Sequence, residues 1–219
     1  VVDSVLPDGV INVITGFGQS AGEPIVKHPD VPVVTFTGSV ATGKKIAKFA
    51  AENLKKVSLE LGGKDPMIIC DDADIEIAAQ GASWGGFVNA GQVCTSIERV
   101  YVFENVMDQF TEAIIEEAKK VVLGDPMKED THIGPMASKL QQKKAIEKVN
   151  QAIKDGARLL AGGSVPENLD RGYFYQPTVL DNIEPNMEII TEEAFSPVLP
   201  IQKVSSIEEA IQWSNDSVY

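Results

Sequence analysis

The chain has 219 residues, of which 43% are apolar, and a formal net charge of −13. This length allows one large domain or two small ones with a buried core. The negative charge opposes binding to nucleic acid or acidic lipid, and no apolar run is long enough for a membrane helix.

The cysteine and histidine content excludes two further classes of protein. Two cysteines cannot form a disulfide framework, and two histidines without a cysteine cluster do not suggest a structural zinc site. The chain shows no export signal, so we expect a protein of the reducing cytoplasm.

Short apolar strands alternate with amphipathic helices along the chain. Strands are expected at 10–14, 31–36, 57–60, 66–70, 97–103, 158–160 and 178–180, and helices at 44–53, 74–89, 107–122 and 138–156, before a final strand–helix pair at 198–215. Strands separated by helices form parallel βαβ units, so we predict an α/β fold.

The glycine-rich segment 38–45 follows an expected strand and opens a helix. Glycine and unpaired helix amides suit a phosphate group. The segment nearly matches a P-loop, but Lys45 stands where the magnesium-binding hydroxyl belongs, which disfavours a nucleotide hydrolase. A dinucleotide pyrophosphate site and a simple glycine cap both remain open.

A second glycine-rich turn at 16–22 supports the dinucleotide interpretation only weakly. Its third glycine falls one residue late for the Rossmann fingerprint. Two such turns after consecutive strands would, however, lie at the same edge of a parallel sheet. We also expect the helix at 44–53 to bury Ile46, Ala47, Phe49 and Ala50.

Cys94 and Glu60 are the candidate catalytic pair. Cys94 has polar and small neighbours, as an accessible thiol requires, whereas Cys70 ends an apolar run and fits an inert core cysteine. Glu60 ends an expected strand before a glycine pair that would let its carboxylate move towards a water, although it could also be an exposed acid at a turn. Neither His28 nor His132 suggests a Cys–His pair, which disfavours a papain-type mechanism.

The segment 192–197 joins acidic residues and an aromatic residue just before a strand. Glu193 could bind ribose hydroxyls while Phe195 lines a nucleotide groove, or the segment could be a capped turn with a buried ring.

Taken together, these segments resemble the NAD(P)-dependent aldehyde dehydrogenase superfamily. The matching motifs occur in family order at 6–13, 36–39 (Phe-Thr-Gly-Ser), 59–64 (Leu-Glu-Leu-Gly-Gly-Lys), 89–94 (Asn-Ala-Gly-Gln-Val-Cys) and 193–198 (Glu-Ala-Phe-Ser-Pro-Val). The resemblance spans almost the whole chain. One residue of these motifs departs from the family pattern: Ser196 replaces the glycine that usually follows the phenylalanine at position 195.

The resemblance implies a role for each matching residue. Cys94 would add to the aldehyde carbonyl, its amide would stabilise the oxyanion, and Glu60 would activate the water that hydrolyses the thioester. The cofactor NAD or NADP would be bound by Gly16, Phe36, Gly38, Ser39, Thr42, Gly43, Leu61, Glu193 and Phe195.

The resemblance also implies a fragment of a longer enzyme. Residues 1–60 would be the C-terminal part of the dinucleotide-binding domain, and residues 61–219 the catalytic α/β domain that carries the cysteine. The family's oxyanion asparagine and ribose-binding lysine are expected in a segment before this one, and a C-terminal part after it. We therefore expect the fragment alone to be inactive or nearly so, and the whole protein to form a homodimer or homotetramer that acts on a small aldehyde.

Two other functions remain open. A coenzyme A-acylating aldehyde dehydrogenase would use coenzyme A in place of water to release the acyl group. A non-catalytic descendant of the same fold is disfavoured by the joint presence of Cys94 and Glu60.

Overall fold

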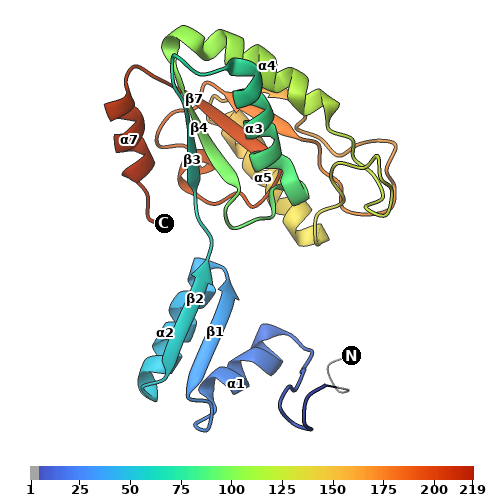
Figure 1. Ribbon diagram of the computed structural model, residues 1–219, viewed down its shortest axis with the longest axis vertical. Helices are drawn as coiled ribbons and strands as arrows, with labels where there is room; N and C mark the ends of the chain where they lie inside the picture. The colour runs from blue at the N-terminus through green and yellow to red at the C-terminus, as the bar shows by residue number, and fades with distance from the viewer. Residues whose placement is uncertain (1–4) are drawn as a thin grey trace. The chain divides into compact units, whose positions relative to one another are not determined.

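The computed structural model describes residues 5–219, which form two compact units. The first unit ends at Gly62, and the second comprises Gly63–Tyr219. Both units combine helices with parallel strands, so the predicted α/β class is confirmed (Figure 1). Within residues 5–219, no helix has the length and apolar content needed to cross a membrane.

The first unit is a parallel strand pair covered by helices. Its elements are η2 (Gly18–Gly22), α1 (Glu23–Lys27), β1 (Val33–Gly38), α2 (Val40–Glu52) and β2 (Lys56–Leu61). Helix α2 begins at Val40 rather than at the predicted residue 44, because the Ser39 hydroxyl caps it by accepting a hydrogen bond from the Thr42 amide at 3.3 Å. Ile46 of α2 packs with Val34 of β1 in a small apolar core.

Other details of this unit also differ from the sequence predictions, and Phe49 of α2 is half-buried rather than buried. Residues 10–14 form no strand, because all are exposed and no strand in the described part of the chain pairs with them. The turn that begins at Gly16 therefore does not follow a strand. Ala47 is exposed because the buried stripe of α2 runs through Gly43, Ile46 and Ala50, and Ala47 lies beyond its edge.

The second unit contains a five-stranded sheet. Its elements are β3 (Asp65–Ile69), α3 (Ile75–Phe87), η3 (Val88–Gly91), β4 (Ile97–Phe103), η4 (Glu104–Val106), α4 (Met107–Lys120), α5 (Lys139–Lys154), β5 (Arg158–Ala161), β6 (Thr178–Asp181), α6 (Glu188–Thr191), β7 (Val198–Val204) and α7 (Ile207–Asn215). The strand order is β3-β4-β7-β6-β5, and all pairs are parallel except the antiparallel β5–β6 pair.

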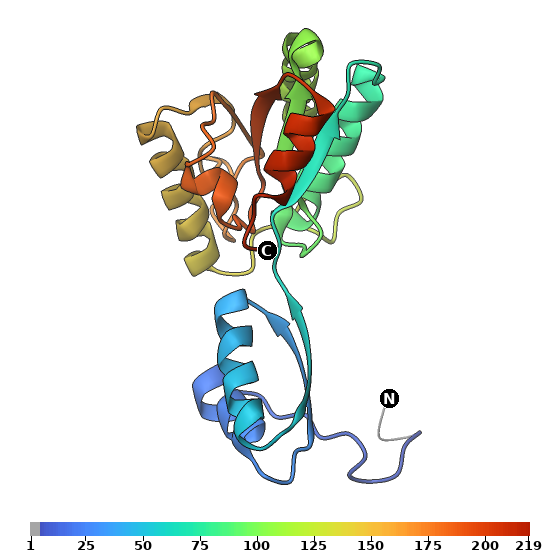
Figure 2. The ribbon, with the colours of Figure 1, turned by 90° about the vertical axis from the view of Figure 1, so that its left-hand side faces the viewer.

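Helices cover both faces of this sheet (Figure 2). In β4, Val100 and Val102 face a core shared with α3 and α4, whereas Tyr101 faces the opposite side and packs with Ala210 of α7. Helices α5 and α6 form a further core on that same side, next to Leu180 of β6. This alternation is the period of two expected for a strand buried on both faces.

The strand order determines which loops meet. Strands β3, β4 and β7 are parallel neighbours, so the segments that lead into them lie at one edge of the sheet. These segments are 63–64, 92–96 and 192–197. The sheet therefore brings the Cys94 segment and the Glu193 segment together at the amino ends of its strands.

Candidate functional site

Cys94 lies at the tip of a tight turn just before β4. The Ser96 amide donates to the Val93 carbonyl at 3.0 Å, which places Cys94 and Thr95 at the two central positions of the turn. The side chain of Cys94 is exposed, as predicted, whereas that of Cys70 is intermediate rather than fully buried. The Ser96 hydroxyl donates to the Gly85 carbonyl at 3.1 Å and anchors the turn to α3.

The backbone just before this turn is strained. Asn89, Ala90 and Gly91 have φ of 52°, 56° and 68°, a left-handed region that only glycine adopts without cost. The Asn89 side chain donates to the Gln92 carbonyl at 3.1 Å, and the Gln92 side chain donates to the Asn89 carbonyl at 3.0 Å. Such strain persists only where its surroundings enforce it and is frequent at functional sites.

Gly91 is also the point at which the Cys94 and Glu193 segments touch. A Cβ on Gly91 would lie 2.1 Å from the Ser196 carbonyl oxygen, which is backbone and cannot move aside cheaply. Ser196 is itself buried, and its hydroxyl has no hydrogen-bond partner among residues 5–219.

Replacing Gly91 with alanine should therefore separate these two segments. We expect Gly91→Ala to lower the free energy of unfolding by about 3 kcal/mol or more, measured by urea titration. Gly156→Ala is the matched control, because Gly156 also has positive φ (111°) but its Cβ would meet only the Met187 methyl group at 3.9 Å. That control should lose only about 1–2 kcal/mol, and equal losses would contradict the contact between the segments.

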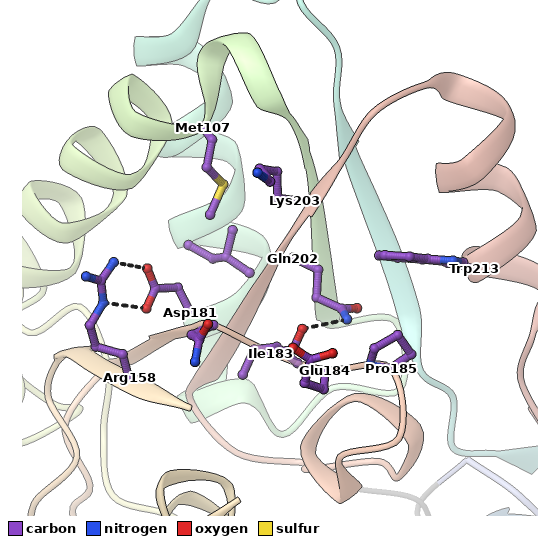
Figure 3. Close-up of a pocket in the computed structure, with 11 residues that line it drawn as sticks. Met107, Arg158, Asp181, Ile183, Glu184, Pro185, Gln202, Lys203 and Trp213 are labelled. Carbon is purple, nitrogen blue, oxygen red and sulfur yellow. Dashed lines mark hydrogen bonds and ion pairs between the residues drawn. The ribbon is translucent and has the colours of Figure 1, made fainter. Parts of the chain in front are cut away.

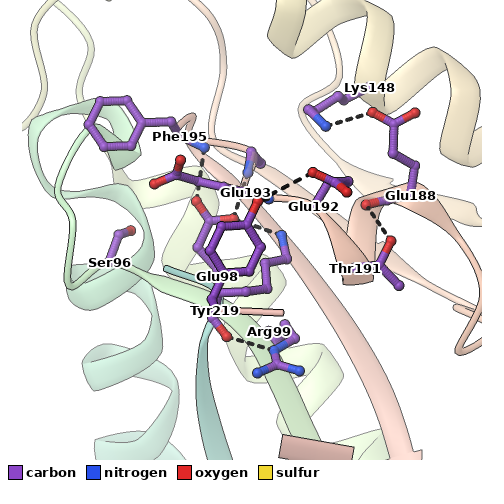
Figure 4. A network of polar contacts seen from close by, with 12 residues as sticks. Ser96, Glu98, Arg99, Lys148, Glu188, Thr191, Glu192, Glu193, Phe195 and Tyr219 are labelled. Carbon is purple, nitrogen blue, oxygen red and sulfur yellow. Dashed lines mark hydrogen bonds and ion pairs between the residues drawn. The ribbon is translucent and has the colours of Figure 1, made fainter. Parts of the chain in front are cut away.

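A buried carboxylate, Glu98, connects the segments that enter the three strands (Figure 4). Its Oε2 accepts from Lys64 Nζ at 2.7 Å and from the Ala194 amide at 2.8 Å, and its Oε1 accepts from the Phe195 amide at 2.8 Å. Lys64 and Glu98 are 2% and 4% exposed, so this ion pair is shielded from solvent.

Burial shifts the pKa of two groups near Glu98. It lowers the pKa of Lys64, although the neighbouring Glu98 favours the charged ammonium. It also raises the pKa of Asp65, with Glu98 adding to the effect. The buried Arg99 donates to the Lys64 carbonyl at 2.7 Å and to the Trp213 and Ser214 carbonyls at 3.1 and 3.0 Å, which joins the end of α7 to the same network.

Glu193 and Phe195 lie in the loop between α6 and β7, and both are half-buried. Burial raises the pKa of Glu193 and Glu98 adds to the rise, while the Gly63 amide and Lys64 favour its ionised form in part. Phe195 has φ of 46°, so this loop is also strained. The Tyr219 hydroxyl accepts from the Glu193 amide at 3.2 Å.

The predicted residues of the first unit lie in or next to its parallel strand pair. Glu60 is exposed in β2, opposite Thr37 of β1. The remaining predicted cofactor residues are Gly16 in an exposed bend, Phe36 and Gly38 in β1, Ser39 and Thr42 at the start of α2, Gly43 inside α2, and Leu61 at the end of β2.

Gly43 shows why a glycine is needed in α2. Its Cβ would lie 2.6 Å from the Leu61 side chain, so glycine lets the helix approach β2 closely. The Ser39 hydroxyl donates to the Thr42 hydroxyl at 3.0 Å on the exposed start of the helix. This arrangement agrees with the sequence expectation of a strand–turn–helix unit at 38–45.

No role was predicted from the sequence for Lys64, Glu98 or Arg99. A signal was present, because Glu98 and Arg99 are consecutive charged residues at the start of an otherwise apolar strand. Charges in a buried strand require partners. The sequence alone did not identify those partners, which come from segments far away along the chain.

A separate hollow of about 590 Å³ is lined by the end of β6 and the segment that follows it, together with residues of α4, β5, β7 and α7 (Figure 3). Its lining includes the ion pair of Arg158 with Asp181, together with Gln202 and Trp213. It contains none of the predicted site residues, so it does not belong to the Cys94 site.

Comparison with known proteins gives consistent matches along the chain. The model of the aldehyde dehydrogenase family matches residues 1–219. The chloroplastic aminoaldehyde dehydrogenase ALDH10A8 of Arabidopsis thaliana is 44% identical over 98% of this chain, and so is the peroxisomal aminoaldehyde dehydrogenase 2 of Pisum sativum. The chain spans only 43% and 42% of the length of these relatives.

A solved structure agrees with these matches. Betaine aldehyde dehydrogenase from Staphylococcus aureus in complex with NAD⁺ has a TM-score of 0.95 and 41% identity, and the match covers 98% of this chain and 43% of that one. The α/β fold predicted from the sequence is therefore that of this solved enzyme over the matching segment.

The prediction of a cytoplasmic location is wrong. The two plant relatives are named as a chloroplastic and a peroxisomal protein. The prediction failed because unpaired cysteines report the redox state of the surroundings and do not identify a compartment.

Proposed function

The chain belongs to the aldehyde dehydrogenase family, and we propose that it forms part of an enzyme that oxidises an aldehyde to a carboxylic acid through Cys94. The observation that carries the proposal is the exposed thiol on a tight turn, next to a strained backbone at 89–91. A cysteine nucleophile has to be accessible to its substrate, whereas structural cysteines are buried and inert.

The proposed chemistry has two stages. The Cys94 sulfur, as thiolate, adds to the carbonyl carbon, and the amide of Cys94 donates to the resulting oxyanion. The aldehyde hydrogen then leaves with its electron pair, and the acyl group remains on Cys94 as a thioester. In the second stage Glu60 takes a proton from water as the water oxygen attacks the thioester carbon. The carbon–sulfur bond then breaks, the carboxylic acid is released, and the proton passes from Glu60 to the Cys94 sulfur.

The family implies a nicotinamide cofactor, which when bound accepts the hydride that leaves the substrate. The first unit fits such a group, because α2 follows Gly38 directly and starts with the exposed hydroxyl residues Ser39 and Thr42. Gly38 and Ser39 would approach the pyrophosphate, with Thr42 and Gly16 near the adenosine. Leu61, Glu193 and Phe195 would hold the nicotinamide and its ribose.

Glu60 precedes the second unit by only a few residues in the sequence. Only Leu61 and Gly62 separate it from Gly63, whose Cβ would lie 3.6 Å from the Cys94 carbonyl oxygen. Free rotation about the glycine pair would let Glu60 adjust its position relative to the thioester.

The test is oxidation by the intact protein of a panel of aldehydes, with NAD⁺ and NADP⁺ compared. The panel should include amino aldehydes and betaine aldehyde, because the relatives are named for these substrates. We expect aldehyde-dependent NADH or NADPH formation, followed by absorbance, together with one carboxylic acid per reduced cofactor. No turnover with any aldehyde, in protein whose Cys94 thiol is shown to be free, would contradict the proposal.

A further inference from the structure

Glu98 is buried and uses both of its carboxylate oxygens to hold neighbouring segments. It accepts from Lys64 Nζ at 2.7 Å and from the amides of Ala194 and Phe195, each at 2.8 Å. Two consecutive backbone amides therefore converge on one charged acceptor. Hydrogen bonds to a charged group are stronger than neutral ones, so this carboxylate fixes the backbone of the loop at these two positions.

The loop needs such an anchor. Phe195 has φ of 46°, which costs energy for a side chain of this size, and it persists only where its surroundings enforce it. Ala194 and Ser196 on either side are buried, so the two amides would lose solvent without gaining a partner if Glu98 were absent.

Stability alone does not account for the arrangement. A buried ion pair is often no more stabilising than apolar residues of the same volume, because both charges lose their hydration. The Lys64–Glu98 pair is nearly fully buried, yet its carboxylate directs both amide bonds to the segment that carries Glu193. These two hydrogen bonds hold the loop at 192–197 in one position.

We propose that Glu98 is a positioning residue that fixes the loop of Glu193 and Phe195 in the conformation that binds the nicotinamide cofactor, an inference that rests on the proposed function. Lys64 neutralises the Glu98 carboxylate, and Arg99 in turn holds the Lys64 carbonyl at 2.7 Å. Glu98 itself contacts neither substrate nor cofactor in this proposal. It acts through the two amides that it accepts.

The test uses Glu98→Gln in the intact protein. Glutamine keeps the volume but removes the charge and one acceptor oxygen. Amide hydrogen exchange of a peptide covering residues 190–197 should become roughly 10- to 100-fold faster, the factor that corresponds to one lost hydrogen bond to a charged group. The Kd for NAD⁺, measured by calorimetry, should rise by about tenfold or more.

Other measurements separate positioning from general damage. The rate at which iodoacetamide alkylates Cys94 without cofactor should stay unchanged, because the side-chain hydrogen bonds of Glu98 within residues 5–219 go to Lys64, Ala194 and Phe195 and not to the Cys94 turn. In steady state, KM for NAD⁺ should rise more than kcat falls.

The matched control is Asp181→Asn, which breaks another ion pair with a buried carboxylate. Asp181 is 5% exposed and pairs with Arg158 at the far end of the sheet (Figure 3). This variant should leave both the exchange of residues 190–197 and the Kd for NAD⁺ unchanged. Equal effects in the two variants would overturn the proposal.

A double variant covers the case in which Glu98→Gln folds poorly because Lys64 is left as an unpaired buried charge. Lys64→Met with Glu98→Gln removes that charge and should recover the Tm, while the fast exchange and weak cofactor binding remain. Recovery of cofactor affinity together with Tm would overturn the proposal, and so would fast exchange with unchanged Kd.

Failure of the proposed function would look different. Wild-type protein that binds no NAD⁺ would contradict the proposed function and the role of this loop in cofactor binding. The exchange measurement would then still report whether Glu98 holds the loop.

Discussion

Replacing Cys94 with alanine should abolish aldehyde oxidation by the intact protein. We expect kcat to fall by at least about 10⁴-fold, because no other group in the proposed mechanism can form the covalent intermediate. NADH formation under saturating aldehyde and cofactor measures the loss. The Kd for NAD⁺ should change little, since Cys94 is not among the residues proposed to bind the cofactor.

Cys70→Ala is the matched control for this variant. Cys70 follows β3 and is less exposed than Cys94, and the proposed mechanism gives it no role. Activity should be retained in Cys70→Ala, and iodoacetamide should label Cys94 before Cys70 and inactivate the enzyme in parallel with that labelling. Equal labelling of both thiols, or substantial turnover without Cys94, would refute the role of this cysteine.

Local sequence signals predicted most of the second unit correctly. The strand at 97–103 matches β4 at both ends, because apolar residues make up all of it except Glu98 and Arg99. The helix predicted at 74–89 begins at Ile75, because Asp74 caps it by accepting from the Ile77 amide at 3.2 Å. Caps and apolar periodicity are local properties, so the sequence carries them directly.

The strand predicted at 10–14 failed for a physical reason. Its valines and isoleucines satisfy the propensity for a strand, but a strand is stable only when a neighbour accepts and donates its backbone hydrogen bonds. In the described part of the chain, no strand pairs with this segment, and its apolar side chains remain exposed. Composition gives no information about whether a partner is present.

The candidate site was predictable only in part. The polar neighbours of Cys94 correctly indicated an exposed thiol. The ion pair of Lys64 with Glu98, and the two loop amides that Glu98 accepts, depend on β3, β4 and β7 being neighbours in the sheet. That order brings together segments that are far apart in sequence, and no local pattern specifies it.

Replacing Glu60 with glutamine should separate the two stages of the reaction. Glutamine has similar size but cannot take a proton from water, so hydrolysis of the thioester should slow by about 10²- to 10⁴-fold. Addition of Cys94 and loss of the hydride should continue. Rapid mixing with aldehyde and NAD⁺ should therefore give a burst of about one NADH per Cys94, followed by a slow steady state, and mass spectrometry should find the acyl group on Cys94.

Glu52→Gln is the matched control for this last prediction, because Glu52 is an exposed carboxylate at the end of α2 in the same unit. It should keep full steady-state turnover. Absence of the burst in Glu60→Gln, with turnover equally low from the first cycle, would show that Glu60 acts before the thioester forms. Turnover that requires coenzyme A and is insensitive to Glu60→Gln would instead assign the enzyme to the acylating type, because a thiol would then resolve the thioester without a general base for water. The Glu60→Gln variant, assayed with and without coenzyme A, thus decides whether water or a thiol completes the reaction that Cys94 begins.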